Sequence, residues 1–455
     1  MSLSSMNLPA SWESPRLDEV ADVIDSLHKT PKYSTDGYRM VRVTDVRGGF
    51  LDLSNAFFVT DEVFQEFSKR HKPQEGDIVF SRVGSYGNAS YVKTDEPFCL
   101  GQNTAVIIPK INSRFLHQCL QSRVVKRQIE ESAVGSTQKT ISLKSINALR
   151  IPLPPESERD AIASILGALD DKIELNRRMN ATLESLARAI FKSWFVDFDP
   201  VHANAIRQNA GKTGAGQMPA SSAIPTTHDP KVLDLFPSTF QDSELGPIPE
   251  GWSAKPLSDV CDLLSGGTPK KKIEEYWNGN LPWISPKAMN GIHVFESDSC
   301  VTEAAVGNGT RLVPAGTTLV MVRGMGLHQG VRISQAQRDV TFNQDVKALV
   351  PTTVDSTFLL YAVLDAAPIL FGKVRAAGHG TGVLSTDIIK SLEFPVPKDG
   401  LSELTQPLTE LNQEIHSNEL ESQVLAELRD ALLPQLLSGE LPVPEALTAT
   451  ENALV

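Results

Sequence analysis

The sequence predicts an α/β (α+β) protein with two globular blocks in tandem, each followed by a long α-helix, and with the two helices paired as an antiparallel coiled coil. Three observations predict this class. The chain has 455 residues, which is two to three times the length of an ordinary domain. It resembles itself across its two halves. Each half ends in a stretch whose apolar residues recur every three or four positions, which is typical of an amphipathic helix.

The internal repeat is clearest where residues 133–154 align without a gap on residues 376–397, at an offset of 243 and with seven identities in 22 positions. The match continues upstream to Trp12, which corresponds to Trp252. Collinear matches over so long a span indicate a duplication. The sequence therefore predicts an internal pseudo-two-fold relation between the halves.

Within each repeat, short β-branched runs alternate with glycine-rich turns and are followed by one helical stretch, which is typical of a mixed α/β block. A proline-rich ending separates the first block from its long helix, and an Ala-, Gly-, Pro- and Ser-rich stretch without periodicity lies between the repeats. The predicted segments are 1–155 for the first block, 156–200 for the first helix, 201–245 for a linker or loop, 246–398 for the second block, 399–440 for the second helix and 441–455 for a flexible tail.

Each long helix spans roughly 50 Å at about 1.5 Å per residue, which is more than a small block can cover. We expect the two apolar stripes to bury each other, with the aromatic run from Phe191 to Phe198 as packing at a helix end rather than as a stacking surface for bases. The residues assigned to this helix packing are Ile165, Leu169, Ile173, Leu183, Leu186, Ile190, Trp194, Leu408, Leu411, Ile415, Leu425, Leu428 and Leu432.

The formal net charge of −12 is unevenly distributed along the chain. Residues 31–150 carry 17 Lys and Arg against 12 Asp and Glu, whereas residues 399–455 carry one against 11. Nucleic-acid binding thus remains open for the blocks and is disfavoured for the acidic end.

Motifs for catalysis are absent from the sequence. The four cysteines form no CxxC pair, the nine histidines form no HxxxH pair, and no cofactor loop follows a predicted strand. We therefore expect no enzyme activity, no metal and no cofactor bound by this chain. No apolar run reaches the length of a membrane span, and the first 12 residues lack the features of a secretory signal, so a cytoplasmic location is expected.

Several short stretches resemble the specificity subunit of type I restriction-modification systems. They include Gly76–Gly84 (GDIVFSRVG), Gln138–Ser142 (QKTIS), Ile151–Pro155 (IPLPP), Phe191–Phe198 (FKSWFVDF) and Leu432–Glu440 (LLPQLLSGE). The resemblance implies that each block is a target-recognition domain for one half of a bipartite, asymmetric site in double-stranded DNA. It also implies that the helices space the blocks and dock two methyltransferase subunits, with S-adenosylmethionine, ATP and Mg expected on those and on motor-nuclease restriction subunits.

The duplication separates two kinds of candidate DNA contact. Basic positions shared by both repeats cannot distinguish two half-sites, so they are candidates for phosphate contact. Divergent polar positions in matching loops are candidates for base readout, although a surface turn without any contact explains each one equally well. The phosphate candidates are Arg82, Arg323, Lys32 and Lys270, and the readout candidates are Tyr86, Asn88, Gln138, Lys139, His328, Gln329 and His379.

Two other functions stay open on the sequence. One is a recognition module of a different restriction-modification enzyme, whose single partner carries a fused methyltransferase and nuclease. The other is a coiled-coil scaffold without a DNA role, which the basic balance of residues 31–150 disfavours.

Overall fold

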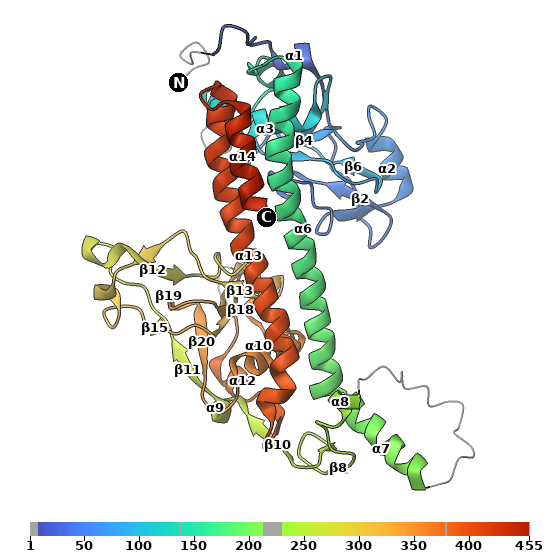
Figure 1. Cartoon of the computed structure of the whole chain (residues 1–455), viewed down its shortest axis with the longest axis vertical. Coiled ribbons are helices and arrows are strands. Elements are labelled where there is room, and N and C mark those ends of the chain that lie inside the picture. The colour runs from blue at the N-terminus through green and yellow to red at the C-terminus, as the bar shows by residue number, and fades with distance from the viewer. Residues whose placement is uncertain (1–7, 136–138, 213–229, 378–379, 455) are drawn as a thin grey trace. The chain divides into compact units, whose positions relative to one another are not determined.

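The computed structural model divides into two compact units (Figure 1). The first unit joins residues 1–178 to residues 419–455, and the second comprises residues 179–418. Each unit thus contains one block together with part of both long helices, which differs from the consecutive segments expected from the sequence. The described residues are 8–135, 139–212, 230–377 and 380–454.

The block of the first unit is built on an antiparallel sheet with strand order β1-β7-β4-β5. A second sheet, in the order β3-β2-β6, pairs β2 with β6 in parallel. All four residues of β4 are buried, and its β-branched and aromatic residues Ile78, Val79 and Phe80 are typical of a strand. The elements are α1 (Leu17–Val20), β1 (Ala21–Asp25), β2 (Tyr38–Val41), η2 (Val43–Asp45), β3 (Phe57–Val59), α2 (Asp61–Phe67), β4 (Ile78–Ser81), β5 (Ala89–Tyr91), β6 (Phe98–Leu100), β7 (Thr104–Pro109), α3 (Ser113–Gln121), α4 (Arg123–Ser132) and α5 (Leu143–Asn147).

The block of the second unit repeats this plan with additions. Its main sheet has the order β11-β20-β16-β18-β13, and further sheets have the orders β14-β12-β19-β15 and β17-β22-β21. The elements are β8 (Phe240–Gln241), β9 (Ile248–Pro249), β10 (Trp252–Pro256), α9 (Leu257–Val260), β11 (Cys261–Ser265), η4 (Glu274–Tyr276), β12 (Trp277–Ile284), β13 (His293–Val294), β14 (Cys300–Val301), η5 (Glu303–Ala305), β15 (Leu312–Val313), β16 (Thr318–Met321), β17 (Arg323–Gly324), η6 (Met325–His328), β18 (Ile333–Ala336), β19 (Val340–Phe342), β20 (Val346–Pro351), α10 (Ser356–Asp365), α11 (Ala367–Gly372), β21 (Arg375–Ala377), β22 (Thr381–Val383), α12 (Thr386–Lys390) and β23 (Glu393–Pro397).

The two blocks confirm the predicted duplication. In the first, β1 pairs with β7 and β7 with β4; in the second, β11 pairs with β20 and β20 with β16. The helix after the last of these strands is capped in the same way in both. Asn112 accepts a hydrogen bond from the amide of Phe115, and Asp355 accepts one from the amide of Phe358, which satisfies a free amide of the first turn.

The two long helices, α6 (Glu156–Phe191) and α13 (Leu401–Ser438), lie side by side within each unit. In the first unit, Asp170 pairs with Arg429 at 2.7 Å and Asn176 donates to Glu421 at 2.7 Å. Residue numbers in these pairs rise along α6 while they fall along α13, so the two helices are antiparallel. In the second unit, Asn180 donates to the carbonyl of Ile415 at 3.2 Å.

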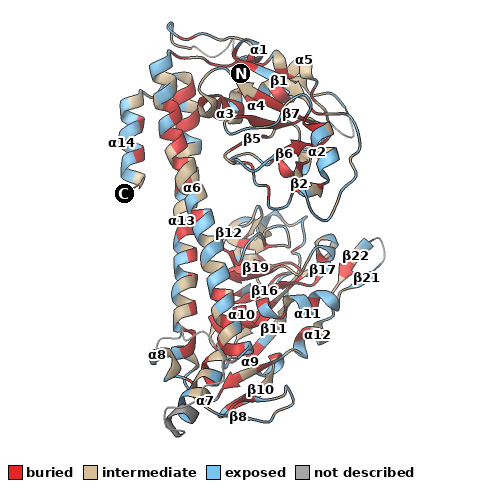
Figure 2. Cartoon of the chain, turned by 90° about the vertical axis from the view of Figure 1, so that its right-hand side faces the viewer, coloured by how far each residue is buried: buried red, intermediate tan, exposed pale blue. Residues whose placement is uncertain are grey.

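The predicted apolar stripes are buried along these contacts, with one exception (Figure 2). Leu186 is 47% exposed, so its assignment to helix packing was wrong, while a role in subunit docking stays a prediction. The buried members in the first unit are Ile165, Leu169, Leu425 and Leu432, with Ile173 and Leu428 partly buried; in the second unit Leu408 and Ile415 are buried, with Leu183, Ile190 and Leu411 partly buried.

The aromatic run at the end of α6 packs into the core of the second unit. Residues Lys192–Val196 form a π-helical turn (η3), and Trp194 packs edge-on against Phe236 with ring centroids 5.6 Å apart. Phe191 and Phe195 are also buried. The structure therefore confirms the interpretation of this run as packing.

The linker and the tail contain helices that the sequence analysis missed. The region expected to be a loop begins with α7 (Asp199–Lys212) and later contains α8 (Pro230–Leu233), while residues 213–229 lie outside the described residues. The predicted flexible tail forms α14 (Val443–Leu454), where Ala446 and Thr450 are buried. Among the described helices, none is long and apolar enough to cross a membrane.

Candidate nucleic-acid interface

Two segments that are far apart in the sequence form one small sheet on the second block. In this sheet, β22 pairs with β17 on one side and with β21 on the other, and Val383 lies opposite both Arg323 and Arg375. Gly324 has φ +140°, a conformation that favours glycine, and a Cβ on Gly382 would lie 2.8 Å from Leu327. We call residues 323–330, 373–377 and 380–383 the second platform.

The second platform is cationic and exposed. None of its segments contains an Asp or Glu, whereas Arg323, Lys373 and Arg375 are all exposed. Within the described residues, none of these three cations forms an ion pair. Their field is therefore not cancelled locally, which favours contact with a polyanion.

Two of the predicted readout residues lie on this platform beside Arg323. The imidazole Nε2 of His328 lies 3.0 Å from the carbonyl of Gly380, which joins η6 to the loop between β21 and β22. Gln329 is exposed, as is Met325, at 74%. His379 lies outside the described residues.

The first block has an equivalent surface, the first platform, formed by residues 82–88, 133–135 and 139–140. Thr140 bridges to both Val83 and Val134, as Val383 does to Arg323 and Arg375. The ammonium of Lys139 lies 6.0 Å from the ring centre of Tyr86. These segments also lack acidic residues. Gln138 lies outside the described residues.

Asn88 plays a part in the fold of the first platform. Its side-chain amide donates to the carbonyl of Val46 at 3.2 Å, and its own carbonyl accepts from the amide of Ser81 at 2.9 Å. This gives the side chain a structural partner, and its role in base readout stays a prediction.

The structure corrects the pairing of Arg82 with Arg323. The carbonyl of Arg82 accepts from the amide of Ile141 at 3.0 Å, and the carbonyl of Val322 accepts from the amide of Leu384 at 2.9 Å. Arg82 is thus equivalent to Val322, so Arg323 stands one residue further along. A shift of one residue in an extended strand turns the side chain to the opposite face.

Arg82 forms an internal ion pair rather than a free surface contact. Its guanidinium pairs with the carboxylate of Asp25, and both side chains are only 12% exposed. This geometry removes the support for a phosphate contact by Arg82 and leaves Arg323 as the better candidate.

The lysines proposed for phosphate contact are exposed in loops. Lys32 lies between β1 and β2, and Lys270 lies between β11 and η4. In the part of the chain that is described, no hydrogen bond or ion pair joins either side chain to the platform of its block. Their assignment stays a prediction.

A cationic groove that the sequence analysis missed adjoins the first platform. Arg47, Arg123 and Lys126 line a cavity of about 350 Å³ together with Arg429 and its partners Asp170 and Asp430. The first three side chains are exposed. The loop that carries Arg47 is joined to the platform because Ser85 donates to the carbonyl of Val43 at 3.4 Å. The one signal for this groove in the sequence was the pair of basic residues, Arg123 and Lys126, at the start of the amphipathic helix α4.

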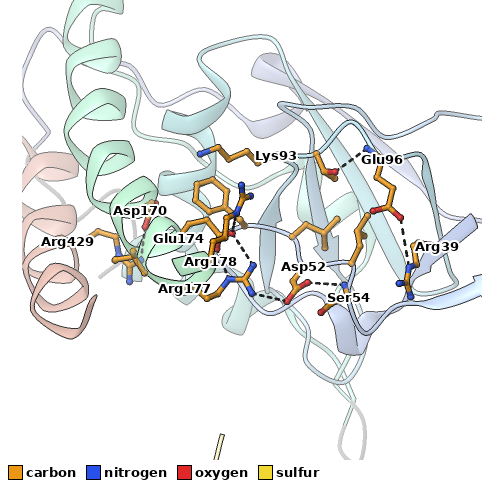
Figure 3. A pocket seen from close by; sticks show the side chains of 16 residues that line it. Arg39, Asp52, Ser54, Lys93, Glu96, Asp170, Glu174, Arg177, Arg178 and Arg429 are labelled. Atoms are coloured by element: carbon orange, nitrogen blue, oxygen red, sulfur yellow. Dashed lines mark hydrogen bonds and ion pairs between the residues drawn. The ribbon is translucent and has the colours of Figure 1, made fainter. Parts of the chain in front are cut away.

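A larger cavity of about 530 Å³ lies between the first block and the two helices of its unit, and its charges are paired internally (Figure 3). Arg177 lies 3.6 Å from Asp52 and 2.8 Å from Glu174, and Arg39 lies 4.0 Å from Glu96. Arg429 pairs with Asp170. Because opposite charges already meet here, we interpret the cavity as a joint between block and helix rather than as a ligand site.

The cysteines behave as apolar packing residues. Cys99, Cys119 and Cys261 are buried, and Cys300 is partly buried. Burial raises the pKa of the Cys99 thiol to about 12, and that of Cys261 likewise to about 12. A thiolate nucleophile is therefore disfavoured at both positions.

Comparison with known proteins agrees with this arrangement of two equivalent blocks. The family model described as the type I restriction modification DNA specificity domain matches residues 9–185 and again residues 249–428. The type I restriction enzyme HindI specificity subunit of Haemophilus influenzae is 29% identical over 406 residues, which cover 81% of this chain and 87% of that protein.

A second relative and a solved structure extend the comparison. The type I restriction enzyme MjaIX specificity subunit of Methanocaldococcus jannaschii is 22% identical over 464 residues, covering 96% of this chain and 95% of that protein. The crystal structure of the type I restriction-modification S subunit from M. genitalium matches with a TM-score of 0.51 and 16% identity, covering 96% of this chain and 98% of that one, and so is alike in fold. Because the family model covers well over half of the sequence, the chain belongs to the type I restriction-modification DNA specificity family.

Proposed function

We propose that this chain selects the DNA sequence on which a type I restriction-modification complex acts, with each block recognising one half of a split, asymmetric site. The observation that carries the proposal is the pair of platforms. They are equivalent in strand pairing and free of acidic residues, yet they differ in sequence. Equivalent frames with different side chains suit two readers of different half-sites.

The contacts divide into two roles under this proposal. Arg323 and Arg375 on the second platform, and Arg47 and Arg123 beside the first, hold the phosphate backbone because a guanidinium matches a phosphate group well. Base readout falls to the polar side chains that the two platforms do not share. These are Tyr86, Asn88 and Lys139 on the first platform, and His328 and Gln329 on the second.

The chain contributes recognition and assembly, while catalysis belongs to partner subunits, since specificity subunits are the non-catalytic members of these systems. We propose that two methyltransferase subunits dock on the helix pair and bring S-adenosylmethionine. Motor-nuclease subunits, which use ATP and Mg, then join the complex. The exposed face of α6 at Leu186 is a candidate for this docking.

Selection from a pool of random DNA duplexes tests the proposal. The full chain with its methyltransferase should enrich two short sequence blocks separated by a spacer of fixed length. Replacing His328 and Gln329 together with Ala should blur one block and leave the other intact. Enrichment of a single continuous block, or blurring of both blocks, would contradict the assignment.

A further inference from the structure

Each block rests on its own long helix through the same small helix, which is α3 in the first unit and α10 in the second. The cap residues of both make the first contact. Asn112 donates to Asp160 at 2.9 Å, and Asp355 accepts from the hydroxyl of Thr405. The two cap residues occupy equivalent positions, but their partners on the long helices differ, and the donor and the acceptor have changed sides.

In the first unit the next contact is an ion pair. The guanidinium of Arg114 donates to both carboxylate oxygens of Asp171, at 2.8 and 3.1 Å, and Lys93 reaches the same carboxylate at 2.5 Å. A Cβ on Gly167 would lie 2.8 Å from Arg114, so the glycine makes room for this guanidinium. Burial opposes ionisation of Asp171, but the hydrogen bonds from Arg114 and Lys93 prevail and lower its pKa.

One turn further along α3, a second charged contact forms. Gln118 donates to Asp170 at 2.5 Å. On its other oxygen, Asp170 pairs with Arg429 of α13 at 2.7 Å (Figure 3). The first block is thus joined through Asp170 to both long helices of its unit.

The second unit has neutral groups at the two matching positions of α10, and their partners on α13 are neutral as well. Thr357, which corresponds to Arg114 at the offset of 243, forms a hydroxyl pair with Thr409 at 3.1 Å. Tyr361, which corresponds to Gln118, donates to the side chain of Asn412 at 3.4 Å. Asn412 in turn donates to Gln335 of β18 at 3.0 Å.

The two sets also differ in exposure. The side chains of Arg114 and Asp171 are 31% and 40% exposed, whereas Thr357 and Asn412 are buried and Thr409 is partly buried. Dissolved ions screen exposed charges strongly and leave buried neutral hydrogen bonds almost unaffected.

We propose that Lys93, Arg114 and Asp171 are positioning residues that hold α3 of the first block on its long helix in a salt-sensitive way, whereas the contacts of α10 in the second unit are neutral and salt-insensitive. Raising the ionic strength loosens the contact of α3 and leaves that of α10 in place. If the proposed function holds, recognition of one half-site depends on salt beyond the ordinary loss of phosphate contacts.

Hydrogen exchange on the full chain without DNA tests the docking directly. From 50 to 500 mM NaCl, amide exchange in α3 should speed up by about two- to fivefold, the range expected for partly exposed ion pairs, while α10 stays unchanged. Equal responses in α3 and α10, or no response in α3, would overturn the proposal. This comparison needs no variant and so does not depend on the folding of a mutant.

Variants then identify the residues responsible. Asp171→Asn should speed exchange in α3 at 50 mM NaCl and remove most of the salt response, whereas Asp171→Glu, which keeps the charge, should retain it. Thr409→Val is the matched control and should affect α10 alone. An Asp171→Asn variant whose α3 keeps the full salt response would exclude the ion pair as the cause.

Duplex selection at both salt concentrations separates this inference from the proposed function. Loss of one sequence block at high salt, together with faster exchange in α3, supports both. Faster exchange in α3 without any sequence enrichment would support the docking inference and defeat the proposed function. Sequence enrichment together with an α3 whose exchange does not respond to salt would support the proposed function and defeat the docking inference.

Discussion

Removing the three exposed cations of the second platform should weaken DNA binding in a way that its salt dependence reveals. Each phosphate contact contributes a slope of about −0.9 to the logarithm of affinity against the logarithm of salt. Replacing Arg323, Lys373 and Arg375 together with Ala should therefore reduce the slope by about 2.7. Affinity falls for both proteins between 50 and 200 mM salt, and the factor by which it falls should be about 40-fold smaller for the variant than for the wild-type chain.

Fluorescence anisotropy with a labelled duplex of random sequence measures this slope, because phosphate contacts do not depend on sequence. Arg207→Ala is the control, since Arg207 is an equally exposed cation of the second unit that pairs with Asp234 on a different surface. It should leave the slope unchanged. A folded triple variant with the wild-type slope would remove the second platform from the DNA interface.

Three further perturbations test particular parts of the structure. Arg82→Ala should destabilise the first unit by about 1–3 kcal/mol, because it leaves a nearly buried carboxylate without its main partner, and hydrogen exchange in β1 and β4 would report the loss. Gly324→Ala should lower the free energy of unfolding by about 1–3 kcal/mol because of the positive φ at this position. Gly372→Ala, where no atom crowds the added methyl group, should change it little when both are measured by denaturant unfolding. Leu408→Asp should disrupt the helix pair, whereas Leu186→Asp should leave circular dichroism unchanged and weaken methyltransferase binding; normal assembly of a folded Leu186→Asp variant would exclude that docking face.

The arrangement of two blocks and two long helices could be predicted from the sequence, because apolar residues that become buried recur at regular intervals. The three-and-four spacing identified both long helices, and the repeat at an offset of 243 predicted two duplicated blocks, whose common strand pairing the structure then showed. The tail was predicted to be flexible, yet Ala446 and Thr450 of α14 are buried, and Ala446 belongs to the hydrophobic core of the first unit. The sequence of the tail alone does not show that its helix packs into this core.

The candidate site was harder to predict because its residues come from segments that meet only in the fold. Arg82 was matched with Arg323 although the two motifs already stood one residue out of register in the sequence, and the hydrogen bonds from Ile141 and Leu384 show that the strands carry this shift. The groove at Arg47 was missed for the same reason, since its neighbours on α4 lie more than 70 positions away. Local sequence does not specify which loops become neighbours.

Exchange of one block tests the central claim most directly. Residues 14–154 would be replaced with the matching block of a relative that recognises a different sequence, and the methylated DNA of a host expressing the hybrid with its methyltransferase would be sequenced. The account predicts that one half of the methylated site changes while the other half and the spacer stay the same. A change in both halves, or in neither, would contradict the assignment of one half-site to each block.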